Sequence, residues 1–328
     1  MSDPAAARLR SGFLFGLVAY GWWGLVPLYF AALPRDMGAY EILAHRITWS
    51  LPILLTLIAV IGGRSDLFRV LRNRRLVLTL LLSSILLAAN WLFYIHATVT
   101  RHVSEASLGY YMMPLINAAL ATIFLGERLR PAHYPALALI AIGVVIPAVA
   151  GGFFPWLAVA VTVSFGFYGL VRKQVAVEST IGLTIETILL LPLSGAVLVY
   201  LWATGRNHMA SDWELNGLIL FSGIVTVVPL LTFTLALRRL PLLALSFMQF
   251  ISPTVQMLLA VWLLGEVLTA EQIAAFACVW AAVAIFIADA VLQAKRKRSD
   301  ASLGGGRKPP VSMTPQRGCA PHSEKLTR

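Results

Sequence analysis

Long apolar runs separated by short polar segments extend through the chain from about residue 12 to residue 290. Each run is about 20 residues long, which is the length that an α-helix needs to cross a hydrocarbon core roughly 30 Å thick. Helices are expected because lipid cannot hydrogen-bond to free backbone groups, and the alternation typical of a membrane barrel does not appear. The pattern predicts ten spans, at residues 12–33, 39–61, 76–99, 104–125, 132–150, 153–171, 181–202, 215–237, 242–264 and 271–290.

Two motifs occur twice along the chain. Residues 21–26, Gly-Trp-Trp-Gly-Leu-Val, return as residues 166–171, Gly-Phe-Tyr-Gly-Leu-Val, and Pro114 and Pro253 each stand twelve residues before a Gly-Glu pair. A duplicated unit of about five helices fits both matches, and many transporters form a substrate path between such halves. The expected domains are a cytoplasmic N-terminus (1–11), a first repeat (12–150), a second repeat (151–292) and a tail (293–328).

Composition agrees with a membrane protein. Of the 328 residues, 59% are hydrophobic and 12% are charged, and the mean hydropathy is +0.79. A soluble domain carries about 25% charged residues, so the share here is about half the usual one. The tail is different because it is polar and basic, with three glycines at 304–306 and two prolines at 309–310. We predict that it is disordered.

The net charge of +11 can indicate a nucleic-acid partner, but the placement of the charges favours a membrane explanation. If the N-terminus is cytoplasmic, 22 of the 26 Lys and Arg residues lie on the cytoplasmic side, and three lie outside: Arg35, Arg101 and Arg206. Arg46 remains within a span. This excess is a positive-inside signal and requires an even number of spans. We predict two cytoplasmic termini, the lipid bilayer and a small-molecule substrate as partners, and no nucleic acid. No obligate protein partner is indicated, and a homodimer is compatible with the sequence.

Five helices per repeat is an odd number, so the two repeats are expected to cross the membrane in opposite directions. The charges after the two Gly-Glu pairs agree with this: Arg128 and Arg130 follow the first pair, whereas residues 267–269 after the second carry no Lys or Arg. The predicted fold is therefore an all-α integral membrane protein of ten helices in two inverted five-helix repeats. Halves of this kind can generate inward-open and outward-open states by exchanging conformations.

Pro114 and Pro253 lie about eleven residues into their predicted helices, which at about 1.5 Å per residue is close to the middle of the membrane. Proline removes a helix hydrogen bond and leaves a carbonyl free, so both residues are candidate hinges. The alternative is that membrane helices simply tolerate proline. The matched depth of the two prolines favours the hinge.

Side chains within the spans supply the candidates for a substrate cavity. The repeated aromatic residues lie too deep for an interfacial belt, so they either fill the interface between the repeats or offer stacking and cation–π surface to a ligand. Charged groups in the spans are costly, which makes each a functional candidate. Glu41, His45 and Glu186 are candidates for proton coupling, since they can change protonation as they change exposure. The predicted cavity residues are Tyr20, Trp22, Trp23, His45, Arg46, Asn90, Tyr110, Tyr111, Asn117, Tyr168, Glu186 and Gln249.

Several stretches resemble the RarD ("chloramphenicol-sensitive protein") family, in the EamA branch of the drug/metabolite transporter superfamily. They are residues 41–50 (EILAHRITWS), 90–92 (NWL), 105–110 (EASLGY), 124–128 (FLGER), 167–173 (FYGLVRK), 185–187 (IET), 225–230 (VTVVPL) and 252–254 (SPT). The resemblance covers about residues 12 to 292. It implies ten helices in two inverted repeats, an inner-membrane location and carriage of a small molecule, and it implies no catalytic residues. The basic tail lies outside the shared pattern.

The leading interpretation is a secondary permease, of exporter type, for small metabolites or drugs. Two alternatives remain: a membrane-embedded enzyme that uses the buried Glu and His residues, and a sensor or assembly subunit that transports nothing. The chain contains no His-Glu-x-x-His, no Gly-x-Ser-x-Gly and no phosphate-binding Gly-x-x-x-x-Gly-Lys loop. We therefore expect no enzymatic activity, no metal and no cofactor.

Overall fold

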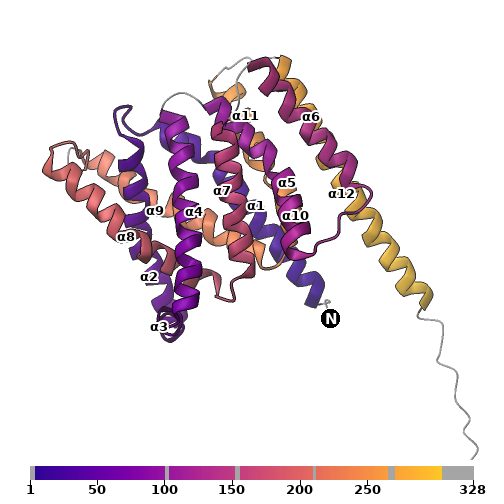
Figure 1. Cartoon of the computed structure of the whole chain (residues 1–328), viewed down its shortest axis with the longest axis horizontal. Helices are drawn as coiled ribbons and strands as arrows, with labels where there is room; N and C mark the ends of the chain where they lie inside the picture. The colour runs from indigo at the N-terminus through magenta and orange to yellow at the C-terminus, as the bar shows by residue number, and fades with distance from the viewer. Residues whose placement is uncertain (1–3, 100–102, 152–155, 210–211, 265–269, 305–328) are drawn as a thin grey trace, which may run out of the picture. The chain divides into compact units, whose positions relative to one another are not determined.

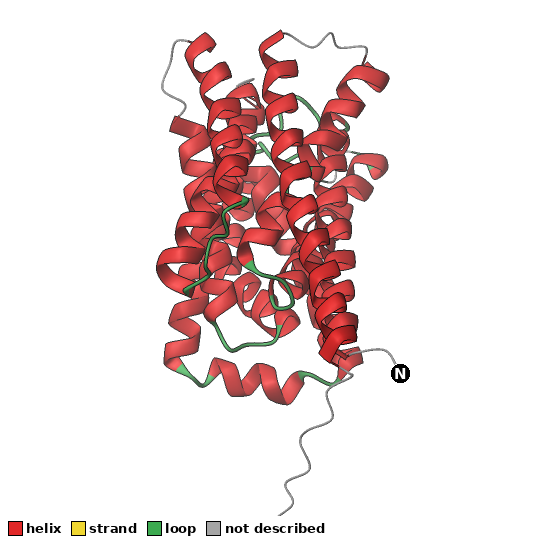
Figure 2. Ribbon diagram, turned by 90° about the vertical axis from the view of Figure 1, so that its right-hand side faces the viewer, coloured by secondary structure: helices red, strands yellow, loops and turns green. Residues whose placement is uncertain are grey.

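The computed structural model describes residues 4–99, 103–151, 156–209, 212–264 and 270–304, and every regular element among these residues is a helix (Figure 2). The helices are α1 (Pro4–Ala31), α2 (Ala39–Ile61), α3 (Arg64–Leu71), α4 (Arg74–Val99), α5 (Val103–Leu125), α6 (His133–Gly151), α7 (Trp156–Gln174), α8 (Ser179–Ala203), α9 (Trp213–Leu237), α10 (Leu242–Met248), α11 (Ile251–Leu264) and α12 (Ala270–Gly304). Among the described residues, seven stretches are long and apolar enough to cross a membrane, and two shorter apolar helices accompany them. The predicted all-α class is confirmed.

The chain divides into two compact units, Met1–Phe286 and Ile287–Arg328, and the boundary falls within α12. The predicted tail begins at residue 293, yet α12 continues to Gly304. Residues 294–298 are Ala, Lys and Arg, which are strong helix formers, so the start of the tail extends the helix. Residues 305–328 lie outside the described part of the chain.

The predicted span 242–264 is not one helix but two, α10 and α11, which meet at Gln249 and Phe250. Pro253 weakens the helix at this point because it has no N–H to donate to the carbonyl of residue 249. The Ser252 N–H donates to that carbonyl instead, over 3.1 Å, and the Thr254 N–H donates to the Phe250 carbonyl over 3.2 Å. In contrast, α5 continues through Pro114 without interruption. The two candidate hinges therefore have different local structures.

The short helix α3 was not predicted from the sequence. Gly62 ends α2 in the left-handed region, with φ at 74°, and its N–H donates to the Ile58 carbonyl. Glycine adopts this conformation without steric cost and is the usual residue past a helix end. The chain then turns into α3, which buries Leu67 and lies at the end of α2 and α4 (Figure 1).

The first unit is held together by closely packed helix pairs. The main pairs are α2 with α8, α1 with α9 and α11, α7 with α4 and α5, α2 with α9, and α4 with α8. Small residues permit the closest approaches, as expected where lipid supplies no hydrophobic driving force between helices. A Cβ at Gly24 of α1 would lie 2.6 Å from the Cβ of Val255 in α11, and a Cβ at Gly223 of α9 would overlap the Trp49 carbonyl of α2.

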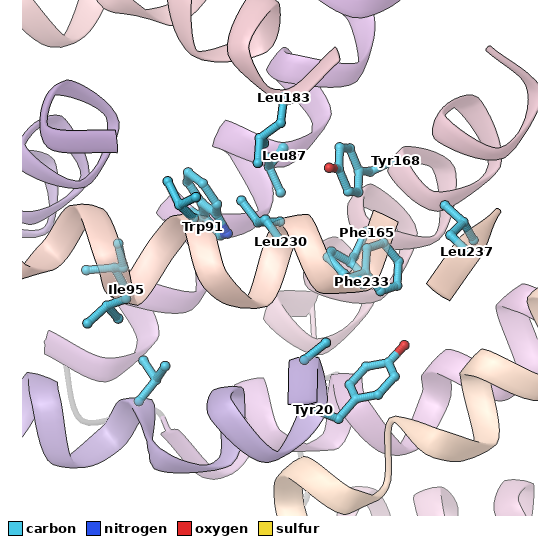
Figure 3. Packing of buried hydrophobic residues seen from close by; sticks show 14 of the residues in the cluster. Tyr20, Leu87, Trp91, Ile95, Phe165, Tyr168, Leu183, Leu230, Phe233 and Leu237 are labelled. Carbon is cyan, nitrogen blue, oxygen red and sulfur yellow. The ribbon is translucent and has the colours of Figure 1, made fainter. Parts of the chain in front are cut away.

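The largest apolar cluster includes residues of α1, α2, α4, α5, α7, α8, α9 and α10. Figure 3 labels its members from α1, α4, α7, α8 and α9. Phe165 and Phe233 are its centre, with ring centroids 5.1 Å apart, and Tyr20 and Tyr168 each contact Phe233. The aromatic residues of the repeated motif therefore help to form the core between the two halves of the chain, residues 12–150 and 151–292.

Candidate functional site

A central cavity lies between the two halves of the chain. Side chains from α1, α2, α4, α5 and α7 and from the α10–α11 junction surround it. About 50 Å³ of its space admits the centres of water-sized molecules, which is room for a few waters. Six of the predicted site residues line it: Tyr20, Trp23, Arg46, Asn90, Tyr110 and Gln249.

Arg46 supplies the only guanidinium or ammonium group among the described residues that line this cavity. The residue is 3% exposed, and its Nε donates to Thr226 Oγ1 over 3.0 Å. Its guanidinium carbon lies 4.7 Å from the centroid of the Trp91 ring and 5.8 Å from that of Phe30. No described carboxylate forms an ion pair with Arg46. Aromatic faces and one hydroxyl therefore hold a positive charge that has no ion-pair partner among the side chains that the structure describes.

Two amide side chains also contribute to the polar lining, along with the hydroxyl-bearing residues Tyr20, Tyr94, Tyr110 and Ser252. Asn90 is fixed by its own donors, because its Nδ2 donates to the Val161 carbonyl over 2.8 Å and to Ser164 Oγ over 3.3 Å. Gln249 lies at the break between α10 and α11, is 3% exposed, and its Oε1 has no hydrogen-bond partner. Other buried side-chain atoms among the described residues also lack a partner, but of their residues only Gln249 lines this cavity, so Gln249 is a candidate ligand-binding group.

Aromatic rings form most of the cavity wall. Trp23 packs against Tyr20, Phe165 and Phe233 with centroid separations of 5.5 to 5.7 Å. The apolar pattern does not show which face of a helix meets the cavity, so seven lining residues could not be predicted from it: Val26, Phe30, Trp91, Tyr94, Met113, Phe165 and Ser252.

Three predicted cavity residues are packed elsewhere in the core. Tyr168 is fully buried in the central apolar cluster, with its ring 6.3 Å from that of Phe233 (Figure 3). Trp22 is half-buried against the same cluster. Tyr111 faces a second cluster and stacks on Phe250 at 6.3 Å. These side chains contribute packing rather than cavity surface.

Asn117 and His45, also predicted for the cavity, are buried without lining it. Asn117 Oδ1 has no hydrogen-bond partner, and a Cβ at Gly166 would lie 3.3 Å from it, so α5 and α7 approach closely there. His45 is 2% exposed, and its Nε2 lies 3.8 Å from Glu41 Oε1, which is beyond hydrogen-bond range. Glu41 and His45 therefore lie close together without a hydrogen bond between them.

Glu186 lies beside a second, smaller cavity of about 10 Å³, which is room for about one water. Ser83 of α4 donates to Glu186 Oε1, and Arg172 Nε of α7 lies 3.6 Å from the same oxygen. Trp91 lines both this cavity and the central one. Arg172 lies in the motif at residues 167–173, but only the fold shows that it faces Glu186.

A third cavity, of about 560 Å³, lies where the α1–α2 and α8–α9 connections meet. The His208 backbone N–H and Nδ1 each lie 2.8 Å from a Glu41 oxygen, and His208 Nε2 lies 3.2 Å from Asp36 Oδ2. We call Asp36, Glu41 and His208 the outer cluster, because the charge pattern predicts that the neighbouring Arg35 and Arg206 lie outside the membrane. Burial lowers the pKa of His208, but hydrogen bonds to Asp36 and Glu41 outweigh it and leave the pKa above its ordinary value. The His208 hydrogen bond also lowers the pKa of the exposed Asp36 carboxyl.

An inner cluster lies at the opposite ends of the helices. Glu127 Oε1 accepts from the Leu242 N–H at the start of α10 over 3.1 Å and lies 3.9 Å from Lys173 Nζ. Gly126 places Glu127 there with φ at 65°. The inner cluster, Glu127, Lys173 and Leu242, therefore joins the first half of the chain to the second. The corresponding pair in the second repeat, at residues 265 and 266, lies outside the described residues.

Known proteins resemble this chain along most of its length. Residues 10–148 match the EamA-like transporter family. An uncharacterized transporter of Vibrio cholerae is 42% identical over 87% of this chain and 95% of its own, and Protein RarD of Escherichia coli is 40% identical over 89% and 98%. Protein RarD of Streptomyces exfoliatus is 38% identical over 94% and 97%. A crystal structure of a protein that is 19% identical matches 84% of this chain and 96% of that chain with a TM-score of 0.65, which shows a shared fold.

Proposed function

Since the chain belongs to the RarD family of EamA-like transporters, we propose that it is a secondary permease that exports a small metabolite or drug. In this proposal ten helices form two inverted five-helix repeats in the bacterial inner membrane, with both termini in the cytoplasm. The repeats alternate between inward-open and outward-open states, and the substrate binds in the central cavity between them.

The helix contacts support a two-fold relation between the repeats. The repeated motifs pair α1 with α7, and α5 with α10 and α11, and the order of the long helices between them pairs α2 with α8 and α4 with α9. When each helix is replaced by its counterpart in the other repeat, the α1–α9 contact corresponds to the α7–α4 contact. The α1–α11 contact corresponds to the α7–α5 contact. In the same way, the α2–α9 contact corresponds to the α8–α4 contact. A duplicated unit related by a two-fold axis requires this correspondence.

The two contact clusters supply the gates of the proposed cycle. The outer cluster joins Asp36 and Glu41 of the first half to His208 of the second, and the inner cluster joins Glu127 to Lys173 and Leu242. Each cluster must separate to open one side of the central cavity. With both formed, the cavity admits only a few waters, as an occluded intermediate would.

The observation that carries the proposal is the buried, unpaired Arg46 in a cavity between the halves. A charge within a span is costly, and intramembrane ionisable residues mark substrate paths in transporters. A purely structural core would not require a cation at this position, because an apolar side chain would pack there without the penalty of desolvation.

Proton coupling is the second part of the proposal, with Glu41, His45 and Glu186 as its candidates. Glu186 is held by Ser83 and Arg172 next to the smaller cavity, so protonation would weaken one ion pair and one hydrogen bond there. Transport in vesicles should respond to an imposed pH gradient, and Glu186→Gln should abolish that response. Equal transport rates with and without the pH gradient would show that transport is not coupled to protons.

The proposal is tested by flux. Untargeted comparison of media and extracts from deletion and overexpression strains should identify an exported compound. Purified protein in liposomes should then exchange that compound in labelled form without altering it, and Arg46→Ala should reduce exchange while inserting normally. Appearance of a new product would favour a membrane enzyme, and unchanged flux in Arg46→Ala would remove Arg46 from the site.

A further inference from the structure

Two of the carboxylates within the spans, Glu41 and Glu186, are engaged away from the central cavity. Glu41 accepts from His208, and Glu186 lies beside Arg172 and Ser83. Among the described residues that line the central cavity, none is Asp or Glu, whereas Arg46 contributes a full positive charge. The cavity thus offers a net positive binding surface at a membrane depth where an uncompensated charge is costly.

Most of the N–H donors of the Arg46 guanidinium have no acceptor among the described residues. It carries five N–H groups, and only Nε has an acceptor among the described residues, namely Thr226 Oγ1. The Trp91 and Phe30 rings lie within 4.7 and 5.8 Å of the guanidinium carbon and hold it in place. A pre-positioned guanidinium binds planar carboxylates through two parallel hydrogen bonds, which a lysine ammonium cannot do.

Gln249 gives the cavity a second polar contact. Its Oε1 is buried and unpartnered, and a side-chain amide can accept a hydrogen bond from a ligand hydroxyl or, turned over, donate one to a carboxylate. The described lining offers no carboxylate to pair with a ligand ammonium group. The polar groups therefore suit an anion better than an amine or a zwitterion.

We propose that the transported substrate is a small organic anion with one carboxylate, which Arg46 binds directly and Gln249 helps to orient. This inference rests on the proposed carrier function and narrows its substrate class. Aromatic rings would contact the apolar body of the ligand. The space of about 50 Å³ favours a compact ligand, because a larger one would require the rings to separate.

Binding of matched probes tests this inference. Benzoate, benzamide and benzylamine have nearly the same shape and differ in charge, and acetate and propionate extend the carboxylate series to smaller sizes. We would measure saturable binding to the full-length protein in lipid nanodiscs by calorimetry, with quenching of tryptophan fluorescence as a second signal. A carboxylate of the series should bind at least about tenfold more tightly than its neutral amide.

Three variants show whether Arg46 causes this preference. Arg46→Gln should remove the discrimination between carboxylate and amide, and Arg46→Lys should retain part of it, because the charge stays while the planar fork is lost. Arg239→Gln is the matched control, since Arg239 also lies over an aromatic ring, at 4.9 Å from Phe15, but does not line the cavity. It should bind as the wild type does. Thermal unfolding in the same nanodiscs verifies that each variant is folded.

The outcomes separate this inference from the carrier proposal. Equal or tighter binding of the amide or amine, discrimination that persists in Arg46→Gln, or no saturable binding of any carboxylate would each overturn the anion inference. If the protein in liposomes exchanges a neutral or cationic compound, the carrier proposal is supported and the inference of an anionic substrate is rejected. If carboxylates bind in a manner that depends on Arg46 but the protein in liposomes exchanges no compound, the anion-binding site is supported and the carrier proposal is rejected.

Discussion

Arg172 and Glu186 form a buried ion pair, with the Arg172 Nε 3.6 Å from Glu186 Oε1 and both side chains at most 2% exposed. Replacing one partner of such a pair leaves the other charge buried without compensation. Glu186→Ala should therefore lower the free energy of unfolding by about 3–5 kcal/mol. Denaturant unfolding in mild detergent, followed by tryptophan fluorescence, would measure the change.

The exposed pair of Asp66 and Arg69 in α3 provides the control. Its N–O distance is shorter, at 2.8 Å, but its side chains are 47% and 76% exposed. Asp66→Ala should change stability by no more than about 1 kcal/mol, because solvent screens surface ion pairs. A loss in Glu186→Ala no larger than in Asp66→Ala would show that the buried pair is not important for the fold.

Gly223 of α9 sets the approach of α9 to α2. A Cβ there would overlap the Trp49 carbonyl, which belongs to the backbone and cannot turn aside. Gly223→Ala should lower the free energy of unfolding by about 1–3 kcal/mol. Gly217→Ala in the same helix is the control, because a Cβ there meets nothing within 4 Å. That change should stabilise α9 by up to about 1 kcal/mol through helix propensity, and equal effects of the two substitutions would contradict the packing account.

The helical plan of the fold follows from the apolar runs, because membrane helices must satisfy their own backbone groups. The runs could not reveal α3, whose short amphipathic sequence resembles a loop, nor the break before Pro253. The same proline chemistry leaves α5 intact at Pro114, so local sequence alone does not decide where a helix separates.

The polar cavity residues were easier to predict than the aromatic ones. Arg46 and Gln249 stand out because polar groups in a span are costly, whereas Trp91 and Phe165 look like ordinary core residues. Glu186 was identified as a buried charge, but its partners Arg172 and Ser83 come from other helices. His208, in the outer cluster, lies in a polar connection with no local signal. Helix faces and long-range pairs require the folded chain.

Pro253 is expected to support turnover more than stability. Pro253→Ala would restore an N–H opposite the Gln249 carbonyl and favour one continuous helix through the α10–α11 junction. Liposome exchange should slow several-fold while the melting temperature in detergent stays similar or rises. Pro114→Ala serves as the comparison, since α5 is already continuous, and it should slow exchange less. Unchanged turnover in Pro253→Ala would exclude a hinge at this break.

The outer cluster should respond to pH through His208. Because its pKa is raised in the folded protein, the protonated imidazole adds stability below its unfolded pKa of about 6.5, and this stability is lost as pH rises through the raised value. Outward opening should thus become easier with rising external pH. Labelling of Ser252→Cys by an impermeant thiol reagent from outside would report it.

His208→Gln separates this effect from the reactivity of the thiol itself. The variant keeps a polar side chain but cannot titrate, so its labelling rate should follow only the ionisation of the cysteine. The wild-type background should show an additional increase with pH. Identical pH profiles in the two backgrounds would mean that the outer cluster does not control access.

Access to the central cavity from each side of the membrane tests the account most directly. In a protein with Cys278 and Cys319 replaced by serine, Ser252→Cys would be probed from each side after cross-linking Asp36→Cys to His208→Cys, or Glu127→Cys to Leu242→Cys. Two inverted repeats that alternate predict labelling only from the cytoplasm with the outer cross-link, and only from outside with the inner one. Labelling from the same side in both cross-linked proteins would contradict alternating access.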